Sequence, residues 1–175
     1  MSFESLLPDD VTALAMRVIE ENRALGRKVA VAESCTGGLV CAALTEIAGS
    51  SAVLDRGFVT YSNEAKMQDL DVSSDLIETF GAVSVACVWA MAQGALAQSD
   101  ADVAVAISGV AGPEGGTDLK PVGTVVFARA RRGGADEQDS ELHKFDAGTR
   151  AEVRRRACLC ALEMLLPREE DDAKV

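Results

Sequence analysis

Three short segments in the first third of the chain bring together side chains that nucleophilic catalysis uses. They read Ala-Glu-Ser-Cys-Thr-Gly-Gly at 32–38, Gly-Ser-Ser at 49–51 and Val-Thr-Tyr-Ser-Asn-Glu-Ala-Lys at 59–66. Hydroxyl and thiol groups become nucleophiles when a nearby base removes their proton, and a lysine can be that base. Glycine lets a ligand approach the backbone closely. The three segments therefore hold the main candidates for a catalytic site.

The first segment is predicted to lie between a strand and a helix. The apolar run 28–32 is typical of a buried strand and 36–48 has a helical pattern, so Ser34 and Cys35 fall on the turn between them. Thr36 suits a helix N-cap, and a helix N-terminus favours a bound phosphate or carboxylate. The segment matches neither of the common glycine-rich phosphate-binding motifs, so its spacing alone is a weak indicator.

A serine nucleophile needs a base, and the sequence offers two. The single histidine, His143, lies in the charged segment 141–144, where it is expected to be exposed. A lysine acts as a base when burial lowers its pKa and leaves the amine neutral. Lys66 follows the strand predicted at 58–61, so we expect it and Tyr61 near the carboxyl edge of the sheet, where such sheets bind ligands.

Each of these residues also has a purely structural interpretation. Ser51 follows a glycine turn and could simply make a local hydrogen bond. Lys66 could be a solvated helix residue that pairs with Glu64 or Asp69. Tyr61 could be a strand residue with its ring in the core and its hydroxyl at the surface. Taken one at a time, these interpretations are the more common ones.

Two other side chains compete as nucleophiles. Ser62 lies four residues before the lysine, but neighbours of this kind point alongside each other and leave little room for a substrate carbonyl. Cys35 lies at a predicted helix N-terminus, which lowers a thiol pKa, although a small buried residue is the simpler interpretation. Ser34 and Thr36 are candidate polar contacts for a substrate, and Glu33 could either bond a ribose or tie down the loop.

The composition predicts one well-buried domain that does not bind nucleic acid. The chain has 175 residues, of which 48% are hydrophobic, and this suffices for one core. Its formal net charge of −11 repels nucleic-acid phosphates, and its one basic run is 154–156. We expect the domain to span 1–166 and the acidic segment 167–175 to be a frayed tail.

The cysteines and the single histidine argue against a disulfide framework and against a zinc site. The first residues lack a basic and apolar leader, so we expect a reducing cytoplasm for Cys35, Cys41, Cys87, Cys158 and Cys160. Cys158 and Cys160 lie two apart on a predicted helix and point in different directions, so they cannot clip a metal. No apolar run is long enough to cross a bilayer. We expect no metal, no other cofactor and no membrane association.

Alternating strand and helix patterns predict a single three-layer α/β/α domain. The expected strands, about five in all, are 28–32, 58–61, 103–107, 123–130 and 141–145. Helical patterns cover 11–26, 36–48, two or three stretches within 63–98, and 150–166. The short link at Gly133 and Gly134 is typical of a hairpin, so the sheet should be mixed but mostly parallel.

The segment 108–121 is too glycine-rich to be a passive link, and it could wrap around or close over a ligand. A long surface turn is the structural alternative. Two motifs lie in and beside it, Ile-Ser-Gly-Val-Ala-Gly-Pro at 107–113 and Lys-Pro-Val-Gly-Thr-Val at 120–125. Together with the three segments above, they resemble the C-terminal domain of the competence/damage-inducible protein CinA. The resemblance runs from Val11 to Leu166 and rests on five motifs in the same order.

The resemblance implies an activity and a set of roles. Stand-alone bacterial members of that family are nicotinamide-nucleotide amidases with a mixed α/β sheet. By this resemblance Ser51 is the expected nucleophile, Lys66 the proton acceptor and Tyr61 the orienting or relay group. Arg150, whose guanidinium would suit a phosphate, follows Ala-Gly-Thr where the family commonly has Gly-Asp. The expected substrate-binding residues are Glu33, Ser34, Cys35, Thr36, Gly37, Gly38, Ser50, Ser108, Gly109, Gly112 and Arg150.

The resemblance thus predicts a cytoplasmic, metal-independent amidohydrolase. It would convert nicotinamide mononucleotide and water to nicotinate mononucleotide and ammonia through a serine acyl-enzyme. The alternative is a non-catalytic CinA-like module that binds a nucleotide or a protein in competence or the DNA damage response. A homodimer is also expected, and Trp89 lies on an apolar helix stripe that could serve either a subunit interface or the core.

Overall fold

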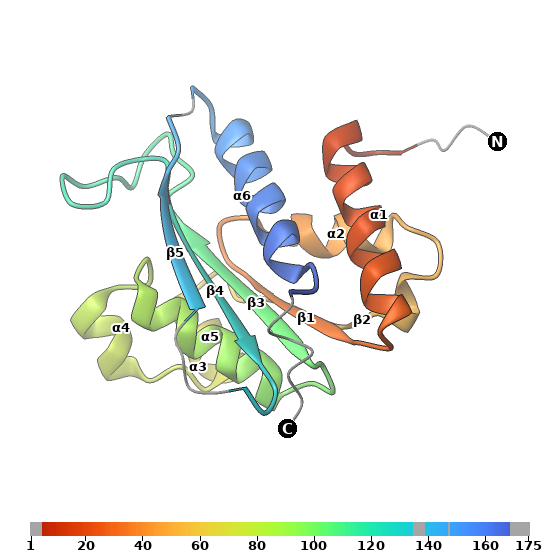
Figure 1. Ribbon diagram of the computed structural model, residues 1–175. Coiled ribbons are helices and arrows are strands. Elements are labelled where there is room, and N and C mark those ends of the chain that lie inside the picture. The colour runs from red at the N-terminus through yellow and green to blue at the C-terminus, as the bar shows by residue number, and fades with distance from the viewer. Residues whose placement is uncertain (1–4, 135–138, 147, 169–175) are drawn as a thin grey trace.

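Five strands form one mixed sheet in the computed structural model, which describes residues 5–134, 139–146 and 148–168 (Figure 1). The sheet order is β2-β1-β3-β4-β5. β1 pairs in parallel with β2 and β3, whereas β4 is antiparallel to both β3 and β5. The strands are β1 (Val29–Glu33), β2 (Leu54–Val59), β3 (Val103–Gly109), β4 (Thr124–Arg131) and β5 (Asp139–Lys144). The predicted mixed sheet is confirmed.

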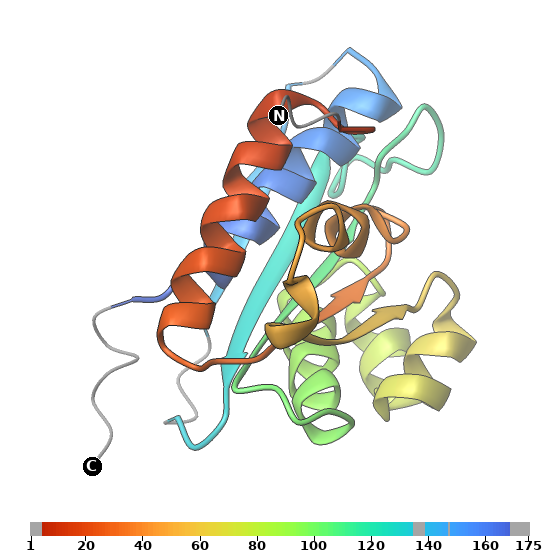
Figure 2. The same ribbon diagram turned by 90° about the vertical axis from the view of Figure 1, so that its right-hand side faces the viewer.

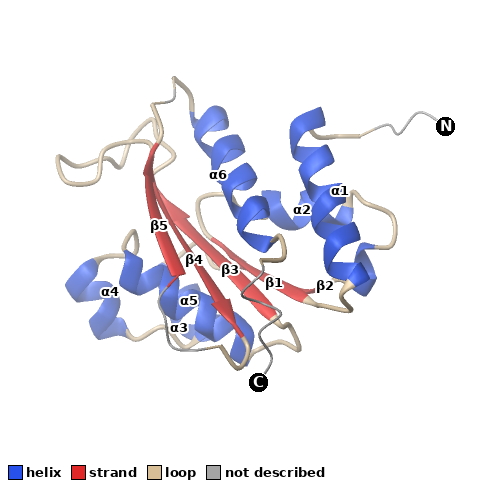
Figure 3. Cartoon of the chain, in the orientation of Figure 1, coloured by secondary structure: helices blue, strands red, loops and turns tan. Residues whose placement is uncertain are grey.

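Helices cover both faces of the sheet and complete the predicted three layers (Figure 3). They are α1 (Asp9–Ala24), α2 (Leu39–Thr45), α3 (Asn63–Leu70), α4 (Ser74–Phe80), α5 (Val85–Ala97) and α6 (Arg150–Leu165), with a short 3-10 helix η1 (Ser50–Ala52). Figure 2 shows α1 and α6 side by side on one face. None of the helices in the described ranges is long and apolar enough to cross a membrane.

Valine and alanine alternate in β1 and β3, so that one face of the sheet presents valines and the other presents alanines. β1 reads Val-Ala-Val-Ala over 29–32, and β3 repeats this over 103–106. Successive strand residues point to opposite faces, so the valines pack with α1, α2 and α6 while the alanines pack with α5 and its neighbours. The apolar stripe on α5 belongs to this second layer, where Val88 and Ala92 are fully buried and Trp89 is partly buried. The stripe is therefore used in core packing.

Two predicted boundaries near the site differ from the structure. The helix predicted at 36–48 is only α2, because Gly37 and Gly38 have φ angles of 60° and 92° and interrupt the helical backbone. The strand predicted at 58–61 begins earlier, at Leu54. It lies at the edge of the sheet, where the half-buried Asp55 and exposed Arg56 fit a strand that has little apolar signal. The acidic residues 169–172 lie outside the described residues.

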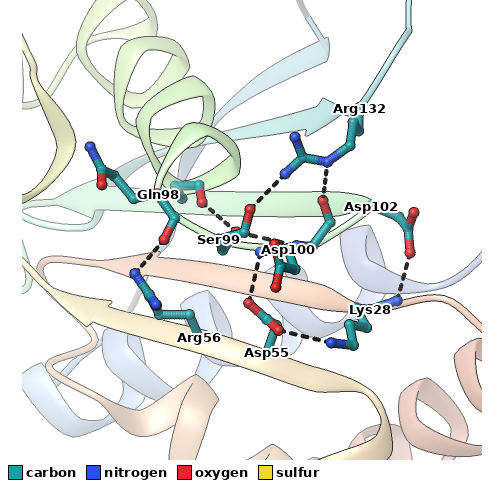
Figure 4. Close-up of polar contacts among 10 residues, drawn as sticks. Lys28, Asp55, Arg56, Gln98, Ser99, Asp100, Asp102 and Arg132 are labelled. Atoms are coloured by element: carbon teal, nitrogen blue, oxygen red, sulfur yellow. Dashed lines mark hydrogen bonds and ion pairs between the residues drawn. The ribbon is translucent and has the colours of Figure 1, made fainter.

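A cluster of polar contacts closes the end of the sheet where β1, β2 and β3 begin (Figure 4). The Asp55 carboxylate accepts hydrogen bonds from the Asp100 N–H at 2.9 Å and from Lys28 Nζ at 3.2 Å. The Lys28 N–H donates to the Asp102 carboxylate at 2.8 Å. The N–H of Asp100 and then the charge of Lys28 lower the pKa of Asp55 below its usual value. These contacts tie three strands together.

We expect Asp55→Asn to lower the free energy of unfolding by about 1 kcal/mol at neutral pH, because the carboxylate makes charge-assisted bonds that an amide cannot fully replace. The folded pKa of Asp55 lies below the unfolded one, so its contribution is present above the unfolded pKa and is lost as pH falls through the folded value. Thermal unfolding of the wild-type chain and of Asp55→Asn at about pH 7 and about pH 2 measures the loss of stability and its dependence on pH. The exposed Asp69→Asn is the matched control. Equal losses in the two variants would contradict the prediction.

Candidate active site

A cleft of about 210 Å³ opens where β1 and β3 end. It combines the β1–α2 loop, the segment after β2, the loop before α5, the end of β3 and the start of α6. This is the carboxyl edge of the parallel strands, the usual ligand-binding position in such sheets. The lining residues are Ser34, Cys35, Tyr61, Asn63, Lys66, Ala82, Val83, Ser108, Gly109, Ala111 and Arg150.

Lys66 is the central polar side chain of this cleft. It is 1% exposed, and its Nζ lies 2.8 Å from the Thr60 carbonyl oxygen and 3.4 Å from each of the carbonyl oxygens of Tyr61 and Ser62. A fourth neighbour, Ser34 Oγ, lies 3.2 Å away. A neutral amine has two N–H groups, which can satisfy carbonyl oxygens while its lone pair faces the serine hydroxyl. The arrangement suits a lysine that removes a proton from Ser34.

Burial lowers the pKa of Lys66 below its ordinary value, because the charged ammonium loses hydration. Negative charge on the Cys87 or Cys35 thiols would oppose this shift. Both thiols are themselves buried, and burial raises the pKa of Cys87 and raises that of Cys35 to about 12, so near neutral pH neither is charged. The lysine is therefore shifted toward the neutral form that a general base requires.

Glu33 fixes the loop that presents Ser34. Its side chain is fully buried, and its carboxylate accepts hydrogen bonds from the N–H groups of Gly38 at 3.0 Å, Val40 at 3.1 Å and Cys41 at 2.9 Å. These are the N–H groups that the start of a helix leaves without backbone partners. Of its two predicted roles, tying down the loop is the one its contacts match. The carboxylate also replaces Thr36 as the cap of α2.

Glu33→Gln is expected to lower the free energy of unfolding by about 2–3 kcal/mol, because an amide has one acceptor oxygen where the buried carboxylate has two and would face an N–H with a donor. Chemical denaturation measures the change. The exposed Glu20→Gln serves as the control. A Glu33→Gln chain as stable as the control would show that the three hydrogen bonds add little.

Arg150 joins two walls of the cleft. Its Nη1 donates to the Gly112 carbonyl oxygen at 2.7 Å and its Nη2 to the Tyr61 hydroxyl at 3.0 Å. Tyr61 is 61% exposed, so the pair lies at the mouth of the cleft. Ser108, at the end of β3, is buried and lines the interior beside Gly109. Gly109 must be a glycine, since a Cβ there would lie 2.8 Å from the Thr124 carbonyl oxygen.

The structure does not bring Ser51 to Lys66. Ser51 lies in η1, before β2, whereas Lys66 follows the other end of that strand. A six-residue strand is about 20 Å long, so the two residues lie beyond opposite ends of β2. Ser50, also in η1, likewise lies away from the cleft. The expected pair of Ser51 with Lys66 stays a prediction, and the hydroxyl that lies beside Lys66 Nζ in this structure is that of Ser34.

The other candidate nucleophiles are also placed. The Ser62 hydroxyl caps α3 by accepting from the Ala65 N–H at 3.0 Å, and only the Ser62 carbonyl faces the lysine. Cys35 does not have the lowered pKa that a helix N-terminus was expected to give, because burial dominates. His143 lies on β5, half-buried against Phe127 with its Nε2 2.8 Å from a Glu141 carboxylate oxygen, rather than simply exposed.

Several lining residues were missed in the sequence. Ala82, Val83 and Ala111 have no chemical signature, and only their position between Gly81 and α5 or inside the glycine-rich segment could have indicated them. Asn63 lies two residues after Tyr61, where the predicted strand ends, and this position was a usable signal. Thr36, Gly37, Gly38 and Gly112 shape the loops around the cleft without lining it.

The fold and the site together define a single-sheet α/β domain that holds a buried serine–lysine pair at its carboxyl edge. Its solved neighbours have the same fold. The crystal structure of the competence/damage inducible protein CihA from Agrobacterium tumefaciens superposes with a TM-score of 0.89 at 49% identity, over 93% of this chain and 97% of that one. This chain belongs to the CinA C-terminal domain family, whose model matches residues 11–168.

Relatives of two lengths share this domain. The nicotinamide-nucleotide amidohydrolase PncC of Escherichia coli is 48% identical over 89% of this chain and 93% of that protein. A CinA-like protein of Shewanella loihica is 44% identical over 93% of this chain, which spans 38% of that relative. A putative competence-damage inducible protein of Caldicellulosiruptor saccharolyticus is 47% identical over 85% of this chain, which spans 35% of it. The chain thus corresponds to about a third of these longer proteins and to nearly all of PncC.

Proposed function

We propose that this protein is an amidohydrolase that removes the carboxamide nitrogen of a nicotinamide nucleotide as ammonia. The observation that supports this most directly is the buried Lys66 Nζ, 3.2 Å from Ser34 Oγ inside the cleft. The E. coli relative, matched over nearly its whole length, is a nicotinamide-nucleotide amidohydrolase, which favours the pyridine carboxamide over other acyl groups.

In the proposed reaction Ser34 Oγ attacks the carboxamide carbon while Lys66 takes its proton. The Cys35 N–H, which has no backbone carbonyl as acceptor among the described residues, donates to the developing oxyanion. Lys66 then gives the proton to the leaving nitrogen, which departs as ammonia and leaves an acyl-serine. Water, deprotonated by the same lysine, attacks the acyl carbon and releases the carboxylate with Ser34 restored.

The cleft is small for a whole nucleotide, because small-molecule sites usually measure about 300–1,000 Å³. We therefore place the carboxamide end inside and the sugar phosphate at the mouth, where Tyr61 and Arg150 lie. A guanidinium can bind a phosphate with two parallel hydrogen bonds. Tyr61, bonded to Arg150 rather than to the Ser34–Lys66 pair, fits an orienting role for that arginine better than a proton relay.

The remaining expectations concern location and assembly. The five cysteines are free thiols, which supports a reducing compartment such as the cytoplasm. A homodimer is supported by the exposed apolar side chains of Phe80, Leu119 and Val122. Lys120, next to Leu119 in the sequence, donates from Nζ to the Phe80 carbonyl oxygen at 2.8 Å and so joins the two segments that carry them. Light scattering on the purified chain tests this, and a monomer across working concentrations would reject it.

Ammonia release from nicotinamide mononucleotide by the wild-type chain tests the function. Turnover is expected, and Arg150→Met should raise KM for the mononucleotide much more than KM for nicotinamide riboside, which has no phosphate. A folded wild-type chain without turnover on either compound would reject the amidase. Binding of the mononucleotide without turnover would instead support the non-catalytic module.

A further inference from the structure

Arg154 reaches the loop that holds Ser34 although it does not line the cleft. It lies one helical turn after Arg150 on α6, so both side chains project from the same face of that helix. Its Nη2 donates to the Thr36 carbonyl oxygen at 2.8 Å. The same nitrogen lies 3.7 Å from the position of a Cβ on Gly37, so the guanidinium packs against the turn itself.

The peptide group between Thr36 and Gly37 is hydrogen-bonded on both sides, through its carbonyl oxygen to Arg154 and through its N–H to Ser34. The Thr36 carbonyl belongs to the Thr36–Gly37 peptide, whose N–H donates to the Ser34 carbonyl oxygen at 3.0 Å. Residues 34–37 thus form a turn with Cys35 and Thr36 at its centre. With both ends of that plane bonded, the Cys35 N–H keeps a fixed direction relative to the Ser34 hydroxyl.

Among the hydrogen bonds of the described residues, the one from Arg154 reaches the Thr36 carbonyl oxygen from outside the loop. Glu33 bonds the N–H groups from Gly38 onward, beyond the turn. The Thr36 hydroxyl is buried and has no hydrogen-bond partner among the described residues, so the side chain does not anchor the turn either. The Leu39 N–H also reaches the Thr36 oxygen, but at 3.3 Å and from within the loop.

We infer that Arg154 is a positioning residue that orients the Ser34–Gly37 turn, so that the serine hydroxyl and the Cys35 N–H meet the acyl carbon and its oxygen together. The inference rests on the proposed function. Misplacement of a reacting group by about 1 Å can cost about 100-fold in rate. Loss of the guanidinium should therefore lower kcat and leave KM nearly unchanged, since Arg154 has no place among the residues that line the cleft.

The test compares Arg154→Met and Arg154→Lys with Arg155→Met as the matched control. Arg155 is the next residue on α6 and pairs with Asp10 and Glu152 at the surface. We expect kcat for nicotinamide mononucleotide to fall about 10- to 100-fold in Arg154→Met, to recover partly in Arg154→Lys, and to stay at the wild-type value in the control. If Arg154→Met does not fold by circular dichroism, the Arg154→Lys comparison decides.

A second readout separates this inference from the substrate assignment. In the reaction of a fluorophosphonate with Ser34, the Oγ–P bond forms, the P–F bond breaks with loss of fluoride, and the hydroxyl proton goes to Lys66. Mass spectrometry of the labelled peptide gives the rate, which should fall in Arg154→Met by a factor similar to that in kcat. Labelling as fast as in the wild-type chain, or a rise in KM with unchanged kcat, would overturn the inference whether or not the chain deamidates nicotinamide mononucleotide.

Discussion

Ser34→Ala is expected to abolish ammonia release, with kcat at least about 1,000-fold below the wild-type value, because no other hydroxyl in the described residues lies within hydrogen-bond distance of Lys66 Nζ. The Ser34→Ala chain should still bind the nucleotide and unfold at nearly the wild-type temperature. Steady-state kinetics and thermal unfolding measure the two properties.

Ser51→Ala is the matched control for that experiment. It removes the same atom from a serine in η1, at the end of β2 away from the cleft. This substitution should change neither kcat nor KM. A large loss in Ser51→Ala with full activity in Ser34→Ala would return the nucleophile to Ser51. It would also require a conformation in which η1 meets the cleft.

Substitution of Lys66 should have the second-largest effect. Lys66→Ala removes the general base and is expected to lower kcat about 100- to 10,000-fold. Lys66→Arg should be similarly inactive, because a guanidinium does not lose its proton in proteins. Added primary amines should restore part of the activity of Lys66→Ala, since they can enter the space that the side chain leaves.

The pH dependence of the wild-type chain tests the same residue independently. The neutral amine is the active form, so kcat/KM should rise with pH through the pKa of Lys66. Because burial lowers that pKa, the rise should occur below the ordinary lysine value of 10.5. It should be absent from the residual activity of Lys66→Ala. A rise centred at the ordinary value would show that burial does not activate this lysine.

Much of the architecture could be predicted from the sequence because apolar periodicity reports burial. Two of the predicted strands correspond to β1 and β3, which are buried on both faces. Their aliphatic residues are 29–32 in β1 and 103–107 in β3. β2 was placed too late because an edge strand with Asp55 and Arg56 has little of that signal. The end of α2 nearest the site was misplaced because Gly37 and Gly38 adopt left-handed backbone angles that no periodicity records.

Part of the site could also be predicted from the sequence. Lys66 was chosen because burial would activate it, and the structure buries it. Ser51 was predicted as its partner from the family resemblance, and that pairing stays a prediction. Ser34 was not predicted as the partner, because the sequence pattern does not show which serine lies at the end of the strands where Lys66 lies. Ser34 is separated from Lys66 by a complete helix and strand, yet both follow strands that end at the same edge. Only the parallel pairing of β1 with β2 makes them neighbours.

The position of α6 has a consequence for the order in which the site can form during synthesis. Ser34, Lys66 and the end of β3 belong to the first two thirds of the chain, but Arg150 and Arg154 belong to its last helix. A nascent chain that has not yet released α6 from the ribosome could pair the serine with the lysine and would lack the mouth of the cleft and the outer support of the turn. Activity should therefore appear only once synthesis of the domain is nearly finished.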